Sequence, residues 1–256
     1  MNRPRLEFAW RSDRGRVRKR NEDAVVVDPG TGVVVIADGI GGASAGDVAS
    51  RLAAEVISRR FLHQPPSRSD PQAARHLAES AVDEANAAIL AHARDSRGCS
   101  GMGTTVVVGY LGNDWLAYAH VGDSRLYRLR DGRLEQLTSD HSLIQELVDQ
   151  GFFPTRDQAR QNGINDNLLT RAVGSAPHPV SPPTAVSELA AGDIFLFCTD
   201  GLTSMVPREQ IESVLNAARG SLDAVADILV HRACDNGGVD NITLALVRIN
   251  AVAPPA

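Results

Sequence analysis

The stretch VVVIADGIGG at residues 33–42 is an apolar, strand-forming run that ends on a carboxylate, Asp38. Three glycines follow Asp38 within four positions, so side chains are scarce there. An Asp-Gly pair often does no more than make a turn. The alternative is that the strand holds Asp38 as a metal ligand and the glycines leave room for the metal and its substrate. The positions of the other acidic residues decide between these readings.

Three further aspartates stand in the same setting. Asp123 follows AYAHVG, Asp200 ends FLFCTD before a glycine, and Asp240 precedes the strand-like run NITLALV. The ends of strands in a layered sandwich gather on a common rim, and carboxylates brought together there raise each other's pKa values unless a cation neutralises them. Oxygen-only ligands favour Mg²⁺ or Mn²⁺. The pattern therefore indicates a two-metal carboxylate site, although one such aspartate alone is most often a turn or cap residue.

Other metal and phosphate chemistries lack their motifs. The seven histidines show no HExxH and no other close ligand spacing, which disfavours zinc. No cysteine has an arginine six residues later, as a cysteine phosphatase needs, and no second aspartate lies two residues after Asp38. The glycine-rich stretch is neither a Walker A loop nor a GxGxxG motif.

Strand-like and helical runs predict an α+β fold. Strands are expected at 23–28, 33–38, 104–111, 115–121, 124–130, 133–137, 193–199 and 241–249. Helices are expected at 44–63, 71–95, 142–150, 208–218 and 221–235. Hairpins in the middle, such as the turn at Asp131-Gly132, imply antiparallel sheet with helices covering its faces. We expect one domain over residues 1–250, with a flap at about 140–175 and a disordered tail at 251–256.

Composition points to a soluble cytoplasmic protein. A chain of 256 residues with 43% apolar and 22% charged residues can bury a sizeable core. The net charge of −5 argues against nucleic acid as the main partner. No apolar run approaches the roughly 20 residues needed to cross a bilayer, and the first residues lack the apolar core of a signal peptide. The three unpaired cysteines fit a reducing compartment.

Six motifs in order resemble one known family. The sequence is similar to bacterial metal-dependent (type 2C) protein serine/threonine phosphatases over about residues 8–249. The motifs that carry the resemblance are RSDRGRVRKRNEDA, VVVIADGIGG, GMGTT, HVGDSRLY, LFCTDGL and GVDNIT. The resemblance implies a four-layer αββα sandwich, with two central antiparallel β-sheets flanked by helices and metals at one end. This agrees with the rim inferred from the aspartates.

The resemblance also implies a ligand set. Asp38 matches the aspartate that bridges two metal ions, and the carbonyl of Gly39 matches a ligand of one of them. Asp200 and Asp240 match the remaining ligands of the first metal. Asp123 matches the residue that, together with Asp200, takes a third and weaker metal in bacterial members.

Residues near the acidic rim have matching roles in the family. Glu22 and Asp23 resemble acidic residues that hold metal-bound water. Arg18 has the spacing of the arginine that clamps the substrate phosphate, and its planar fork suits bidentate contact with phosphate. Arg20 lies on the same face of an extended segment and is the alternative. Asn241 resembles a residue that orients its loop without binding metal.

The family mechanism implies attack on phosphorus by a metal-activated water at a binuclear Mn²⁺ or Mg²⁺ centre. One departure concerns the proton donor to the leaving group. Eukaryotic relatives have a histidine after Asp-Gly, where this sequence has Ile40. A metal-bound water, His120 or His141 could serve instead, and the residues do not choose among them.

The implied substrates are phosphoserine and phosphothreonine proteins, among them a cognate bacterial Ser/Thr kinase that the enzyme would oppose, with no nucleic acid or membrane partner. Two rival functions stay open. One is a catalytically silent sensor or binding module, which the presence of Asp38, Asp200 and Asp240 disfavours. The other is a hydrolase of small phosphoesters.

Overall fold

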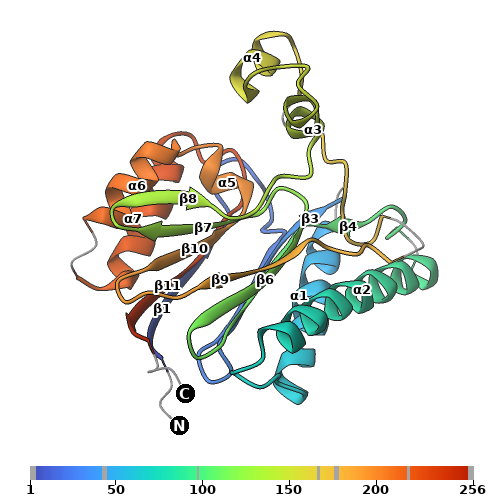
Figure 1. Cartoon of the computed structure of the whole chain (residues 1–256). Coiled ribbons are helices and arrows are strands. Elements are labelled where there is room, and N and C mark those ends of the chain that lie inside the picture. Colours follow the sequence, from blue (N-terminus) through green and yellow to red (C-terminus); the bar gives the residue numbers. More distant parts are fainter. Residues whose placement is uncertain are drawn as a thin grey trace.

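The computed structural model describes residues 4–41, 45–96, 98–165, 168–175, 179–217 and 220–252. Within these ranges the strands form two antiparallel sheets that lie face to face (Figure 1). One sheet has the order β1 (Arg5–Asp13), β11 (Ile242–Ala251), β10 (Ile194–Cys198), β7 (Arg125–Arg130), β8 (Arg133–Gln136). The other has the order β2 (Asp23–Asp28), β3 (Val33–Ile40), β5 (Val106–Leu111), β6 (Trp115–Val121), β9 (Thr184–Glu188), and the short β4 (Gly103–Thr104) pairs with the end of β3.

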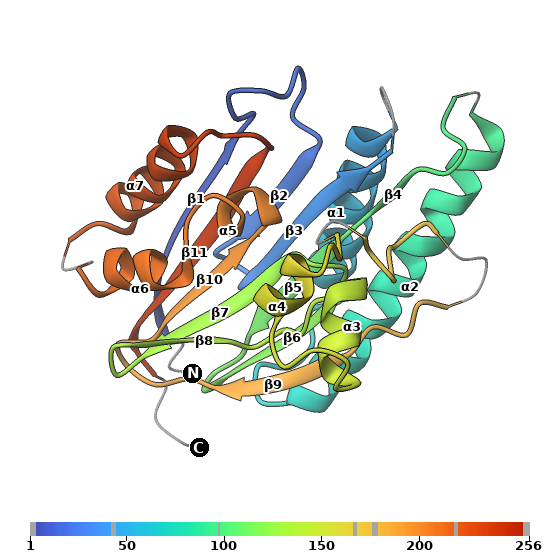
Figure 2. The same ribbon diagram turned by 90° about the horizontal axis from the view of Figure 1, so that it is seen from above.

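Helices cover the outer face of each sheet. The β3 sheet is covered by α1 (Gly46–His63) and α2 (Pro71–Asp95). The β11 sheet is covered by α6 (Arg208–Asn216) and α7 (Leu222–Asp235), with the short α5 (Asp200–Thr203) at its rim. Two further helices, α3 (Leu143–Asp149) and α4 (Arg156–Gln161), stand above the sandwich in Figure 1 and lie in front of the sheets in the view from above in Figure 2.

Three apolar clusters hold these four layers together. Alternation along each strand sends side chains to opposite faces, so one strand serves two clusters. In β3, Val33 and Val35 pack with the helices α1 and α2, whereas Val34 and Ile36 pack between the sheets. In β11, Leu244 and Leu246 face the helices, and Ala245 and Val247 face the other sheet. Because both faces of these strands are buried, their sequences read as nearly continuous apolar runs, VVVIA in β3 and LALV in β11.

The expected αββα sandwich is confirmed, and most element bounds agree within two residues. Two strands were missed. β1 (Arg5–Asp13) pairs along its length with β11, and β9 (Thr184–Glu188) edges the other sheet. Ala251, which the sequence analysis assigned to a disordered tail, belongs to β11; the rest of that prediction concerns mainly residues 253–256, which lie outside the described part of the chain.

The segment between β8 and β9, residues 137–183, contains α3 and α4 and is called the excursion below. Its first residues are fixed to the sandwich. Asp140 is buried and accepts hydrogen bonds from Arg125 Nε at 2.8 Å and from Arg156. The backbone N–H of His141 donates to the carbonyl of Gly122 at 2.9 Å. The first residues of the excursion are therefore joined rigidly to the residue that follows β6. None of the described helices is both long enough and apolar enough to cross a membrane.

Candidate metal centre

The acidic residues singled out in the sequence come from the ends of five strands at one rim of the sandwich. Asp38 lies near the end of β3, and Asp23 opens the neighbouring β2 directly opposite it. Asp200 follows β10, Asp240 precedes β11, and Asp123 follows β6. Antiparallel neighbours alternate in direction, so a strand that ends and a strand that begins meet at the same rim.

One cavity of about 250 Å³ brings most of these side chains together. Its lining includes the predicted residues Arg18, Glu22, Asp38, Gly39, Asp123, Asp200 and Asp240. Asp23 does not line this cavity. It lies beneath, where its Oδ2 accepts a hydrogen bond of 3.0 Å from the Thr199 hydroxyl. Arg20 does not line the cavity either, so the structure favours Arg18 as the arginine that meets a ligand there.

Burial and mutual repulsion raise the pKa values of these carboxyl groups. Burial is the largest cause for Asp38, whose pKa lies well above its usual value, and the charges of Asp23 and Asp200 add to it. Burial raises the pKa of Asp23 to about 7, with Asp200 contributing. Burial likewise raises the pKa of Asp123 to about 7, and the charge of Asp200 is the next largest cause. A cluster of this kind is unfavourable when ionised unless a cation joins it.

Unpaired buried oxygens are a second reason to expect divalent ions at these carboxylates. One side-chain oxygen of Asp23 and one of Asp200 are buried without a hydrogen-bond partner. A buried acceptor left unpaired costs about 1–3 kcal/mol, so such atoms usually have a partner such as a metal or water. Hard oxygen donors of this kind suit Mg²⁺ or Mn²⁺.

The described side chains are not gathered closely enough to act together as the ligands of one metal ion. As they stand, no three acidic, histidine or cysteine side chains among them lie close enough to hold one metal ion. Arg18 Nη2 donates to Asp240 Oδ2 at 2.6 Å and so occupies a predicted ligand. If Asp240 is a metal ligand, as the sequence predicts, a metal ion would compete with Arg18 for its Oδ2 oxygen.

Two glycines permit close backbone contacts around the site. A Cβ on Gly39 would lie 2.2 Å from the carbonyl oxygen of Gly46, at the start of α1. A Cβ on Gly201 would lie 1.9 Å from the carbonyl oxygen of Asn241. The sequence interpretation gave the glycine after Asp38 the role of leaving space for metal and substrate. The structure shows that Gly39 also lets α1 approach β3.

Asn241 holds residues 14–22, the arm that carries Arg18, next to Asp240. Its Nδ2 donates to the carbonyls of Arg14 and Arg20, at 2.9 and 2.8 Å. Its Oδ1 accepts from the N–H of Glu22 at 2.8 Å. One side-chain amide thus satisfies three backbone groups of the arm. That Asn241 orients its own loop next to Asp240 stays a prediction.

The two candidate histidines anchor the excursion. His120 and His141 stack with ring centroids 4.8 Å apart, and neither lines the acidic cavity. His120 Nε2 donates to the Ser139 carbonyl, and His141 Nδ1 accepts from the N–H of Gly122. Burial lowers both pKa values, that of His141 to about 4. Both rings are therefore neutral near pH 7.

Two lining residues received no role from the sequence. The Thr105 hydroxyl accepts from the N–H of Asp38 at 3.0 Å and contacts the Ser124 hydroxyl at 2.7 Å. It thereby fixes the backbone that carries Asp38. Thr105 is the last residue of the GMGTT motif, so the sequence did mark this position. Leu169 closes the cavity from the excursion, and no local pattern marks it.

Comparison with known proteins identifies the family. The model of the family described as protein phosphatase 2C matches residues 14–232. The chain belongs to the protein phosphatase 2C family. It is 37% identical to the serine/threonine phosphatase stp of Listeria welshimeri, over 96% of each chain. The catalytic domain of the serine/threonine protein phosphatase PstP in complex with two manganese ions is 35% identical, with a TM-score of 0.83 over 97% of this chain and 99% of that one. The serine/threonine phosphatase of S. agalactiae is 32% identical, with a TM-score of 0.87 over 96% of this chain and 100% of that one.

The acidic rim should make the metal-free phosphatase less stable as the pH rises. A carboxyl group whose pKa is raised by folding favours the folded state while protonated, and this stabilisation is lost as the pH rises through the folded pKa. For Asp23 and Asp123 the loss extends up to about pH 7. We expect Asp38→Asn to raise the Tm of EDTA-treated protein at pH 8 and to change it less at pH 5, measured by calorimetry.

The exposed Asp157 provides the control, since Asp157→Asn removes a carboxylate that does not line the acidic cavity. A Tm that falls in Asp38→Asn at pH 8 would show that the aspartate stabilises the metal-free rim, contrary to the repulsion argued here.

Arg18 should compete with metal for Asp240. Removing it frees a carboxylate oxygen, and an ion pair that is partly exposed is worth about 0.2–1 kcal/mol. We expect Arg18→Ala to tighten Mn²⁺ binding by about two- to fivefold, measured by isothermal titration calorimetry. Arg20→Ala removes the same charge without touching Asp240 and is the control. Mn²⁺ affinity equal in the two variants would contradict the competition.

Proposed function

We propose that this protein is a metal-dependent protein serine/threonine phosphatase that hydrolyses phosphoserine and phosphothreonine. The observation that carries the proposal is one cavity lined by acidic strand ends and Arg18, in a member of the protein phosphatase 2C family. Repelling carboxylates supply a cation site, and a guanidinium beside them supplies a phosphate contact.

The proposed ligands follow the rim. Asp38 would bridge two Mn²⁺ or Mg²⁺ ions, with the Gly39 carbonyl on one of them. Asp200 and Asp240 would complete the first site. Asp123 would hold a third, weaker ion together with Asp200. The unpaired oxygen of Asp200 supports its part in this set.

The chain's own residues account for positioning. When bound, two divalent ions supply Lewis acidity that makes water nucleophilic near neutral pH. Asp38 is held at the rim by the N–H bond to Thr105 and by the Thr104 hydroxyl, which donates to the Asp38 carbonyl at 2.7 Å. Arg18 would leave Asp240 and bind the substrate phosphate. Glu22 and Asp23 would accept hydrogen bonds from water at the ions.

A side-chain general acid is not assigned. His120 and His141 are neutral and engaged with the base of the excursion, so neither is placed to protonate a leaving group in the acidic cavity. This leaves the leaving oxygen to take its proton from water.

Hydrolysis of a phosphothreonine peptide tests the proposal. We expect wild-type turnover with Mn²⁺, none with EDTA, and a loss of at least about a hundredfold in kcat for Asp38→Asn, since removal of even one hydrogen-bond donor to the transition state costs about 2.7–4 kcal/mol in other enzymes. Phosphate release with malachite green gives the rates. An inactive wild type that binds Mn²⁺ normally by calorimetry would point to a binding module instead.

We also propose that the physiological substrates include a cognate Ser/Thr kinase, and that the protein acts in the cytoplasm. Residues 1–250 would form one catalytic domain, with residues 140–175 as its flap. Incubation with the autophosphorylated kinase and Mn²⁺ should remove phosphate from its threonines, as followed by intact mass. A kinase left fully phosphorylated, under conditions that dephosphorylate the peptide, would exclude it as a substrate.

A further inference from the structure

Two buried hydroxyl residues lie beside the acidic cavity, and neither is among the proposed metal ligands. Thr105 lies between β4 and β5, and Ser124 lies between Asp123 and β7. Each is only 1% exposed, and Thr105 Oγ1 is 2.7 Å from Ser124 Oγ. One of the two hydroxyls therefore donates to the other, across the start of β5 and the end of β6. This hydroxyl pair joins the neighbour of Asp123 to a residue that is bonded to Asp38.

Thr105 supplies a hydrogen bond of the sheet at Asp38 through its side chain. The strand β3 pairs with β5 up to Ile36 and with β4 from Gly39, in one register, which places Thr105 opposite Asp38. The Thr105 N–H donates to the Asp38 carbonyl at 2.9 Å, as in a regular antiparallel pair. The return bond differs, because the Asp38 N–H donates to the Thr105 hydroxyl at 3.0 Å and not to a backbone carbonyl. The acceptor of this N–H is thus a side chain, which a substitution can remove.

The Thr105 hydroxyl has little freedom to leave this position. A Cβ on Gly122 would lie 2.6 Å from the Thr105 methyl carbon, so the methyl group packs closely against Gly122. A β-branched side chain is stiff about χ1, and a methyl group packed in this way restricts it further. Ser124 holds the hydroxyl from a second direction. The N–H of Asp38 is therefore bound to an oxygen whose own position is set by two further contacts.

We propose that Thr105 is a positioning residue for Asp38 and that Ser124 acts through Thr105. This inference rests on the proposed function, in which Asp38 bridges two metal ions. An aspartate side chain is short, so the position of its carboxylate follows the position of its backbone. A displacement of about 1 Å in an active site can cost about a hundredfold in rate. A hydroxyl that fixes the Asp38 backbone should therefore affect both turnover and metal binding through Asp38, without itself holding an ion.

The first test measures the hydrogen bond in the metal-free protein. Amide hydrogen exchange of Asp38, followed by NMR, should be at least about tenfold faster in Thr105→Val than in wild type, because valine has the same shape and leaves the N–H without an acceptor. Thr105→Ser keeps the hydroxyl and should restore slow exchange. Exchange in Thr105→Val as slow as in wild type would overturn the proposal.

The second test compares kinetics and metal binding. In Thr105→Val we expect kcat on the phosphothreonine peptide to fall about tenfold, KM to stay within about twofold of wild type, and Mn²⁺ affinity by calorimetry to weaken. Thr105→Ser should restore all three. Ser124→Ala should cause a smaller loss, and adding it to Thr105→Val should cost nothing further, because the two hydroxyls act as one unit. Fully additive losses would overturn the role of Ser124.

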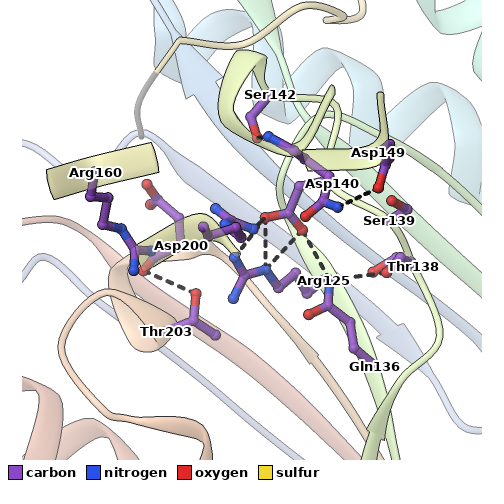
Figure 3. Close-up of polar contacts among 12 residues, drawn as sticks. Arg125, Gln136, Thr138, Ser139, Asp140, Ser142, Asp149, Arg160, Asp200 and Thr203 are labelled. Carbon is purple, nitrogen blue, oxygen red and sulfur yellow. Dashed lines mark hydrogen bonds and ion pairs between the residues drawn. The ribbon is translucent and has the colours of Figure 1, made fainter. Parts of the chain in front are cut away.

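Thr138→Val is the matched control. The buried Thr138 hydroxyl accepts from the N–H of Leu126 at 3.1 Å, and Thr138 does not line the acidic cavity. Figure 3 shows Thr138 beside Gln136, whose Nε2 donates to the Thr138 carbonyl at 2.9 Å. We expect both valine variants to lower Tm, and only Thr105→Val to lower kcat. A kcat that falls equally in both, or in neither, would overturn the positioning role.

Failure of the proposed function would be distinguishable from failure of this inference. Turnover of no peptide by wild type would overturn the proposed function. Amide exchange at Asp38 and Mn²⁺ affinity would still show, without any turnover, whether Thr105 positions that residue.

Discussion

Repulsion among carboxylates at one rim is the constraint on which the rest of this structure depends. Asp23, Asp38 and Asp200 would each be better solvated apart, and burial raises their pKa values. The fold holds them together because Asp38 and Asp200 lie at the ends of the buried strands β3 and β10, and Asp23 pairs with Asp38 across β2 and β3. Packing of three apolar clusters thus supplies the free energy that keeps an unfavourable charge cluster in place.

The surroundings of the rim limit how far those side chains can move. Thr105 fixes the backbone of Asp38, and Asn241 joins the arm of Arg18 to the strand after Asp240. Gly39 and Gly201 let backbone segments approach where any side chain would collide. The backbone at the site is therefore well determined, while the carboxylates and Arg18 retain the freedom to exchange partners.

The sequence allowed prediction of the features that are local or repeated. Apolar strands ending on aspartate located the rim, and motifs in order indicated the sandwich. β1 was missed because RLEFAWRSD alternates weakly and merges into a basic arm, so that only its pairing with β11 makes it a strand. The ion pair of Arg18 with Asp240 joins residues 222 positions apart, and the hydrogen bond from Thr199 to Asp23 joins residues 176 positions apart. No local sequence pattern predicts either of these long-range contacts.

The pairing of β1 with β11 also bears on how the protein is made. Residues 5–13 lie at the edge of their sheet and hydrogen-bond only to residues 242–251 within that sheet. During synthesis this strand must wait, without its partner, until nearly the whole sandwich has emerged. The arm that carries Arg18 and the strand that follows Asp240 therefore come together in the last stages of folding. A chain interrupted before β11 would leave the edges of β1 and β10 unpaired, and no strand would hold Asp240 at the acidic rim.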